Sequence, residues 1–147
     1  MSSPRSAPAV QVAAALICRQ GRFLICQRPA HKARGLMWEF AGGKVEPGES
    51  PAEALVRECR EELGLAVTPG PVYARLTHAY PDLTVELILF QVTEFRGEPQ
   101  RLEHAELRWI RVEESGEFEF CPADRPLLER LRREGLPETP QESGGAE

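Results

Sequence analysis

The strongest constraint on the fold is one segment, residues 49–65, in which helix start and stop signals flank an amphipathic stretch. Ser50 is a preferred N-cap, Pro51 suits the first helical position, and Glu53 completes a capping box with Ser50. Gly64 is a typical residue just past a helix C-terminus. These signals predict a helix that begins after Ser50 and ends before Gly64.

This predicted helix has an apolar stripe and a separate acidic face. Three apolar residues at nearly i,i+4 spacing would face the core, namely Leu55, Cys59 and Leu63. Glu58, Glu61 and Glu62 would fall within about 100° of one another on the helix surface. The helix therefore carries three crowded carboxylates on a side that does not pack inward.

Such crowding costs about 0.2–0.5 kcal/mol per like-charged pair, and acids near a helix C-terminus also oppose the macrodipole. A hard divalent cation such as Mg²⁺ or Mn²⁺ would neutralise the cluster, because it prefers carboxylate, carbonyl and water oxygens. Such an ion usually takes some of its ligands from substrate phosphates. Gly42-Gly43, just upstream of the helix, allows the backbone to approach a ligand closely. From the three glutamates alone, a solvated acidic surface is the commoner explanation.

The spacing around the glutamates shifts that balance toward a metal site. The stretch G-KVEPG-E-SPAEALV-R-E-C-R-E-E-L-G-L, from Gly43 to Leu65, resembles the Nudix box G-x5-E-x7-R-E-U-x-E-E-x-G-U at every fixed position. The one soft departure is Cys59 at the first bulky aliphatic site. This change concerns packing more than metal binding.

The resemblance extends to the MutT branch of the family and covers about Val10 to Leu131. It is carried by WEFAGGKVEPGES, by YPD at 80–82, by RGEP at 96–99 and by PADRPLLERL near the end. It implies an α+β Nudix fold, with a mixed β-sheet sandwiched between α-helices. It also implies Mg²⁺-dependent hydrolysis of a nucleoside triphosphate to the monophosphate and pyrophosphate, with Mn²⁺ as a substitute, in the service of nucleotide-pool sanitation.

The same resemblance assigns a set of metal ligands. Glu58, Glu61 and Glu62 would hold the metal directly or through water, and the carbonyl of Gly42 would be a further ligand. Glu58 would also be the favoured general base. Glu103 aligns with an additional metal-binding glutamate that the MutT branch places beyond the box, although an exposed loop glutamate fits the sequence equally well.

Two further residues of the box are expected to support catalysis. Glu49 and Arg57 both match the pattern, and Arg57 lies one helical turn before Glu61, so it could pair with that carboxylate and orient it. The histidines have no metal-ligand spacing between them. Only His104 is a weak candidate, because it follows Glu103.

Basic and aromatic residues near the box are the candidates for binding the nucleotide. Arg28 and Lys44 are the nearest cations for a triphosphate, and either could equally be a surface charge. Trp38, Glu39 and Phe40 precede the glycines, in a segment that the family uses near the base. Aromatic residues at such positions are at least as often part of the core.

Asp124 is the candidate for reading the base. By resemblance, MutT enzymes that remove oxidised guanine nucleotides carry Asn here; an amide both donates and accepts, whereas an ionised Asp only accepts. The recognised edge should then offer donors, as cytosine, adenine and guanine all do. Asp124 could instead simply N-cap the last helix. Ala41, in place of a proline, and PADRPLLE also resemble the CTP and 5-methyl-dCTP pyrophosphohydrolases of the same branch.

Four functions remain open from the sequence. The leading hypothesis is a MutT-like 8-oxo-dGTP diphosphatase, with a CTP or 5-methyl-dCTP pyrophosphohydrolase as the alternative. A hypothesis of another class is a nucleotide-sensing domain that binds without hydrolysis, which the intact glutamates disfavour. A Nudix hydrolase for another diphosphate, such as ADP-ribose, is weaker because the flanking motifs resemble MutT.

Composition excludes several other classes. The net charge is −5 and the pI is about 5.4, so no broad positive field favours a nucleic-acid polymer or an anionic membrane. No apolar run approaches the length of a transmembrane helix and no convincing signal peptide opens the chain, so we expect a cytoplasmic location. The four cysteines lack CxxC spacing and are expected to be reduced core residues. We expect a small nucleotide as the partner, and a monomer or a weak dimer.

The chain of 147 residues is long enough for one domain, which we expect at residues 10–134, between a flexible arm at 1–9 and a disordered acidic tail at 135–147. A last helix is predicted from about Pro126 to Arg133, capped by Asp124. The predicted strands are Val10 to Cys18, Phe23 to Gln27, Val72 to Tyr80, Leu83 to Phe95 and Leu107 to Val112. We expect a hairpin at Gly21 between the first two strands, and antiparallel pairing among the last three.

Overall fold

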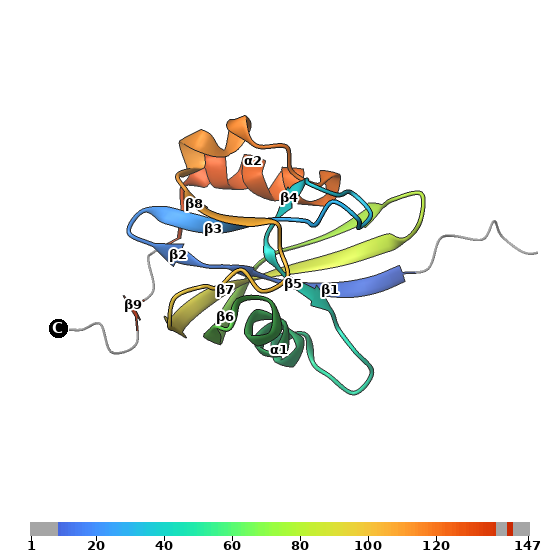
Figure 1. The fold of residues 1–147 in the computed structure, drawn as a ribbon, viewed down its shortest axis with the longest axis horizontal. Coiled ribbons are helices and arrows are strands. Elements are labelled where there is room, and N and C mark those ends of the chain that lie inside the picture. Colours follow the sequence, from blue (N-terminus) through green and yellow to red (C-terminus); the bar gives the residue numbers. More distant parts are fainter. Residues whose placement is uncertain (1–8, 138–140, 143–147) are drawn as a thin grey trace, which may run out of the picture.

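The computed structural model describes residues 9–137 and 141–142, and in it two β-sheets lie between two α-helices (Figure 1). The strands, in chain order, are β1 (Ala9–Leu16), β2 (Cys18–Arg19), β3 (Arg22–Gln27), β4 (Trp38–Glu39), β5 (Ala41–Lys44), β6 (Ala66–Ala79), β7 (Thr84–Arg96), β8 (Glu106–Ile110) and β9 (Gln141–Glu142). The helices are α1 (Pro51–Leu63) and α2 (Arg125–Glu134), with short 3-10 helices η1 (Val112–Glu117) and η2 (Pro122–Asp124). The predicted α+β class is confirmed.

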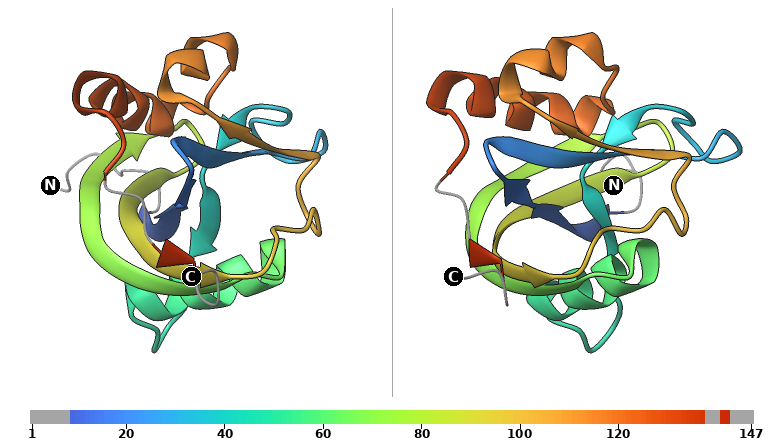
Figure 2. Two further views of the ribbon diagram at one scale, coloured as in Figure 1. Left: turned by 90° about the vertical axis from the view of Figure 1, so that its left-hand side faces the viewer. Right: turned by 60° about the vertical axis from the view of Figure 1, so that its left-hand side comes forward.

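The larger sheet has the strand order β5-β1-β7-β6, with β9 paired to β7. It is mixed, because β1 runs parallel to β7 and antiparallel to β5. Alternate residues of a strand face opposite sides, so Ala13 and Ala15 pack in the core with α1 while Ala14 and Leu16 pack in the core with α2. β6 and β7 form a long curved ribbon along one side of the molecule (Figure 2).

The smaller sheet is built around β3, which pairs with β2 and β4 on one side and with β8 on the other. The chain passes from this sheet to the larger one at Phe40, between β4 and β5. This crossing brings β5 against α1, so Gly42 and Gly43 lie beside the acidic face of the helix. The crossing is what positions the glycines of the box.

The caps predicted for α1 are confirmed. The Ser50 Oγ accepts a hydrogen bond from the Glu53 N–H at 3.1 Å, and the Glu53 carboxylate accepts one from the Ser50 N–H at 2.9 Å. Gly64 ends the helix in the left-handed conformation, with φ at 63°, and its N–H donates to the Arg60 carbonyl. The predicted apolar stripe is fully buried, and it consists of Leu55, Cys59 and Leu63.

The last helix is also where it was predicted, with Leu127, Leu128 and Leu131 buried. The predicted cap is wrong, because the Asp124 side chain makes no capping hydrogen bond. η2 runs directly into α2, so the backbone of Asp124 is already helical, with φ −87° and ψ −17°. An N-cap side chain needs an extended backbone to reach the free N–H groups, and Asp124 is instead left to point elsewhere.

The strand pattern differs from the prediction in several places: β4 and β5 were not predicted, and β6 begins at Ala66 instead of Val72. The predicted strand from Val10 to Cys18 is divided at Ile17 into β1 and β2, which belong to different sheets, so the hairpin turn at Gly21 joins β2 to β3. The predicted strand at 107–112 is β8, and it pairs with β3 rather than with β6 or β7. The antiparallel pairing of β6 with β7 is confirmed.

All four cysteines are buried and free, as predicted. Burial raises the pKa of Cys18, Cys59 and Cys121 to about 12, so these side chains remain thiols near neutral pH.

Most of the predicted arm and tail lies outside the described residues. Ala9 begins β1, and within the tail only 135–137 and 141–142 are described. In the described part of the chain, no helix combines the length and the apolar character needed to cross a membrane.

Candidate active site

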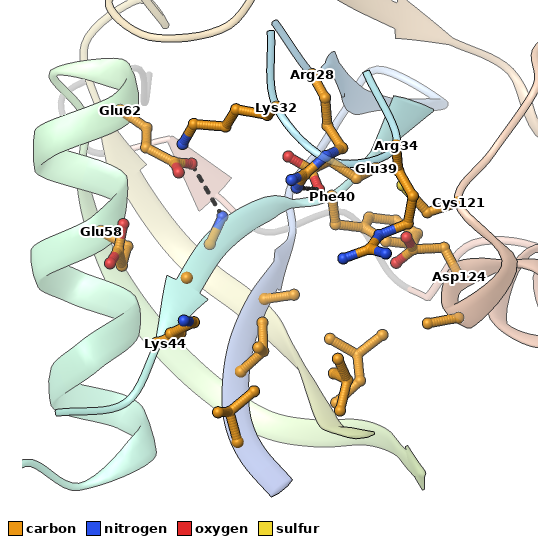
Figure 3. Close-up of a pocket in the computed structure, with 18 of the residues that line it drawn as sticks. Arg28, Lys32, Arg34, Glu39, Phe40, Lys44, Glu58, Glu62, Cys121 and Asp124 are labelled. Carbon is orange, nitrogen blue, oxygen red and sulfur yellow. Dashed lines mark hydrogen bonds and ion pairs between the residues drawn. The ribbon is translucent and has the colours of Figure 1, made fainter. Parts of the chain in front are cut away.

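A cavity of about 600 Å³ opens between α1, β5 and the loop that joins β3 to β4 (Figure 3). Its size suits a small-molecule ligand. Ten of the residues predicted for the site line it, and these are Arg28, Glu39, Phe40, Gly42, Lys44, Glu58, Glu61, Glu62, Glu103 and Asp124. Residues scattered over the whole chain therefore converge on one space.

Three predicted site residues do not line the cavity: Trp38, Glu49 and Arg57. Trp38 is only 7% exposed, and its ring meets Phe118 edge-on with the ring centres 5.1 Å apart. The core therefore covers the Trp38 ring, which is the alternative that the sequence left open for these aromatic residues. Phe40, two residues later, is nearly buried but does reach the cavity wall.

The acidic end of the cavity is formed by α1 and β5. Figure 3 shows Glu58 and Glu62 projecting from α1 toward β5. The Gly42 N–H donates to the Glu62 Oε1 at 3.1 Å. A Cβ at position 43 would lie 2.3 Å from the Cδ of Glu58, so only glycine leaves room for that carboxylate. The two glycines therefore let the strand and the carboxylates approach each other closely.

Burial and mutual repulsion act on these carboxylates. Burial, followed by the negative charge of Glu39, raises the pKa of Glu62 to about 9. Burial also raises the pKa of Glu58, against the opposing effect of Arg57. Glu103 contributes to both shifts, so its carboxylate is close enough to influence both groups. A cation at this end would favour the ionised forms.

The oxygen donors of these groups suit a hard divalent cation, although the carboxylates do not all point toward one common position. Over residues 9–137 and 141–142, no three His, Cys, Asp or Glu side chains converge as a ready-made metal site. Glu62 is turned to the Gly42 N–H, and Glu58 accepts from the Arg57 Nη1 at 3.0 Å. Carboxylates that are held together against their repulsion are the donors that such an ion prefers.

Arg57 is the hub that holds the acidic end together. Its guanidinium donates to the Glu49 carboxylate at 2.6 Å and 3.0 Å, to Glu58 at 3.0 Å and to Glu61 at 3.3 Å. It also donates to the Lys44 carbonyl at 3.0 Å, which ties α1 to β5. The predicted pair of Arg57 with Glu61 is present, and these contacts suit the supporting role expected for Arg57 and Glu49.

Hydrogen bonds and charge contacts link the acidic end to the opposite end of the cavity. The Arg28 Nη1 donates to Glu39 at 2.9 Å, and its Nε donates to the Ala33 carbonyl at 2.8 Å. The buried His104 lies between two glutamates, with its Nε2 at 3.3 Å from Glu39 and at 3.8 Å from Glu62. Arg28 is thus engaged by Glu39, which the sequence did not indicate.

Asp124 lies at the opposite end and is 6% exposed. In the described part of the chain no hydrogen bond reaches its carboxyl group, which faces the cavity. Burial, and then the charge of Glu39, raise the pKa of Asp124 well above its ordinary value, which favours the neutral form of the carboxyl group. The sequence suggested only an ionised, acceptor-only side chain, whereas a neutral carboxyl both donates and accepts as an amide does.

The sequence reasoning missed several residues that line the cavity. Lys32 comes from the loop after β3 and extends toward Glu62 in Figure 3, and Arg34 follows it in the same loop. Tyr80, Asp82 and Cys121 come from the β6–β7 turn and the start of η2. The YPD motif at 80–82 was a visible signal for two of them. No local pattern marked the loop residues.

Comparison with known proteins identifies the family. A model described as the NUDIX domain matches residues 12–130. The CTP pyrophosphohydrolase of Escherichia coli (strain K12) is 45% identical over 120 residues, covering 82% of this chain and 89% of that protein. The 8-oxo-dGTP diphosphatase of the same strain is 32% identical over 127 residues, covering 84% and 97%. The MutT protein from Methanosarcina mazei Go1 has a similar structure, with a TM-score of 0.80 and 29% identity, covering 91% and 100%.

A carboxylate-bearing helix against a glycine-rich strand, at one end of a cavity of about 600 Å³, is an arrangement suited to a hydrolase of phosphorus anhydrides. The chain belongs to the NUDIX domain family, so the predicted family, its fold and its hydrolase class are confirmed. Nudix hydrolases generally use a divalent metal, and the acidic end of this cavity fits one in its donor set.

Proposed function

We propose that the protein is a Mg²⁺-dependent nucleoside triphosphate pyrophosphohydrolase that releases the monophosphate and pyrophosphate and cleanses the nucleotide pool. The observation that carries this proposal is one cavity of about 600 Å³ with carboxylates at one end, at Glu58 and Glu62, and Asp124 at the other. A triphosphate bound along the cavity would place its phosphates at the acidic end and its base at the other.

The residues of the chain divide the work between them. Glu58, Glu61, Glu62, Glu103 and the Gly42 carbonyl would hold the metal, which when bound would neutralise charge on the phosphates and make the attacking water more acidic. Glu58 would act as the general base that accepts a proton from the attacking water. Lys44 and Lys32, both at the cavity wall, provide positive charge for the triphosphate. Arg57 and Glu49 keep Glu58 and Glu61 oriented.

Two kinds of base are supported. The relative with 45% identity is named a CTP pyrophosphohydrolase, and other relatives are named 8-oxo-dGTP diphosphatases. A neutral Asp124 presents one donor and one acceptor, which suits the edge of cytosine as well as that of guanine. In this neutral form Asp124 does not choose between these bases.

The decisive experiment is a panel of triphosphates, incubated with pure protein and Mg²⁺ and analysed for products. It should include dCTP, CTP, 5-methyl-dCTP, 8-oxo-dGTP, dGTP and dATP. Release of monophosphate together with pyrophosphate supports the proposal, and no turnover on any member contradicts it. Calorimetry with a non-cleavable analogue is the second measurement. Tight binding with Mg²⁺ but no product would establish a nucleotide sensor instead.

The state of Asp124 gives a testable prediction. Asp124→Asn should keep kcat/KM at pH 7 within about a factor of three, whereas Asp124→Leu should lower it about 10- to 100-fold, because it removes both hydrogen-bonding atoms. The raised pKa means that the wild type is neutral at low pH and becomes charged as the pH rises. KM should therefore rise at alkaline pH in the wild type and stay flatter in Asp124→Asn. A changed base preference in Asp124→Asn at pH 7 would show that an ionised Asp124 reads the base.

We place the domain at residues 10–134, and propose that it acts in the cytoplasm as a monomer or a weak dimer. α2 ends at Glu134, and the buried apolar residues described all lie before that point. Size-exclusion chromatography with light scattering measures the oligomeric state.

A further inference from the structure

Arg34 reaches from the loop between β3 and β4 to the turn between β6 and β7. Its Nη1 donates to the Asp82 Oδ1 at 3.1 Å and its Nη2 to the Oδ2 at 3.5 Å. Its Cζ lies 3.8 Å from the centre of the Tyr80 ring, so the guanidinium is stacked on that ring. The ion pair keeps the pKa of Asp82 below its ordinary value. Two segments far apart in the sequence are thus joined by one side chain.

The backbone of Arg34 is held in an unusual conformation. Its φ is +57°, in the left-handed region that residues other than glycine rarely adopt. The loop is closed around it by hydrogen bonds from the Met37 N–H to the Arg34 carbonyl and from the Leu36 N–H to the Arg28 carbonyl. Such conformations persist where surrounding contacts impose them, and they cluster at functional sites.

The position of Arg34 is at the base end of the cavity. The Tyr80 hydroxyl, beneath the guanidinium, accepts a hydrogen bond from the Ala123 N–H at 2.9 Å, and Ala123 directly precedes Asp124. Figure 3 shows Arg34 and Asp124 on the same side of the cavity, away from Glu58. Arg34 is therefore placed to meet the base rather than the phosphates.

Some hydrogen-bond donors of the Arg34 guanidinium are unoccupied in the described residues. Arginine carries five N–H groups, and the two bonds to Asp82 leave three that no acceptor in residues 9–137 occupies. The side chain is only 20% exposed, so these donors have limited access to water. The Tyr80 ring is covered on one face by the guanidinium, which reduces the ring available to a base.

We propose that Arg34 determines base specificity: its guanidinium, positioned by Asp82 and Tyr80, donates to an exocyclic carbonyl oxygen of the nucleobase. Cytosine and oxidised guanine carry such a carbonyl and adenine does not, so a donor at Arg34 would discriminate between them. The inference rests on the proposed function, since it assigns the bound ligand to the nucleoside triphosphates.

The test compares kcat and KM for dCTP, 8-oxo-dGTP and dATP in the wild type and in Arg34→Met, which keeps an unbranched side chain but removes every hydrogen-bond donor from it. For whichever of the two carbonyl-bearing substrates the wild type prefers, KM should rise about 10- to 100-fold with kcat changed by less than about threefold. The preference over dATP should fall by a similar factor. Arg34→Lys, which keeps the charge without the planar fork, should restore only part of it.

Arg75→Met is the matched control. Arg75 is an exposed arginine of β6 that pairs with Glu86 at 3.5 Å, away from the cavity. It should leave the substrate preference unchanged. Asp82→Asn should weaken the preference in the same direction as Arg34→Met, because it loosens the guanidinium without removing it. If Arg34 only closes the loop, Arg34→Met will lower the melting temperature and slow all substrates equally, and the proposal is then overturned.

Binding without turnover separates this inference from the proposed function. Isothermal titration with cytidine, adenosine and pyrophosphate needs no hydrolysis. Weaker cytidine binding in Arg34→Met, with unchanged pyrophosphate binding, supports the contact to the base even if no triphosphate is hydrolysed. Loss of pyrophosphate binding with unchanged cytidine binding would make Arg34 a phosphate ligand and refute the proposal.

Discussion

Glu58→Gln is expected to lower kcat about 10²- to 10⁴-fold on the best substrate, because it removes both the proposed general base and a metal ligand. The fold should be retained. Burial raises the pKa of Glu58, so a neutral amide of the same shape suits its site in the metal-free protein. Steady-state kinetics and a thermal melt without metal test both halves of this expectation.

Glu129→Gln is the matched control for that change, because it makes the same substitution at an exposed position of α2. Its kinetics should equal those of the wild type. The melting temperature of the wild type should also rise when Mg²⁺ is added, and Glu58→Gln should show a smaller rise. Full activity in Glu58→Gln would remove this glutamate from the catalytic machinery.

Alanine at the two glycines of β5 should affect different properties of the protein. Gly43→Ala should lower mainly the activity, and Gly42→Ala should lower the stability. In Gly43→Ala the new Cβ would meet the Cδ of Glu58 at 2.3 Å, and a flexible carboxylate can move away. The fold should survive, but a shift of about 1 Å in a catalytic group can cost about 10²-fold in rate. We therefore expect kcat/KM to fall about 100-fold with little change in the melting temperature.

In Gly42→Ala the new Cβ would lie 2.0 Å from the Ala13 carbonyl oxygen, which belongs to the backbone of β1 and cannot swing away. The φ of Gly42, at 150°, adds strain for any other residue. The free energy of unfolding should fall by about 3 kcal/mol or more. Denaturant unfolding of the two variants side by side measures the contrast. Equal stabilities would contradict the packing described for β1 and β5.

Local chemistry made much of the site predictable. The helix caps act between residues three or four apart, so Ser50, Glu53 and Gly64 fixed the bounds of α1 without help from the rest of the fold. The spacing of Glu58, Glu61 and Glu62 placed them on one face for the same reason. The β6–β7 pairing followed from two strand-like runs joined by a short turn, which is again a local signal.

Other features could not be read from neighbouring residues. Trp38 and Phe40 look alike in the sequence and both are buried in the core, yet only Phe40 also lines the cavity. Strand β8 pairs with β3, from which it is separated by more than half of the sequence. A pattern of alternating residues shows which faces are apolar, but not which strand will lie beside them.

By itself the sequence determined the family, the acidic helix and the kind of cation that such a helix suits, because those depend on spacing along one element. The tertiary structure alone decided that Asp124 is buried with a raised pKa and that Arg34 is held by Asp82, since both facts require groups from distant segments to come together. The burial and the pKa of a side chain depend on the groups that surround it in space. The sequence alone does not say which distant residues those will be.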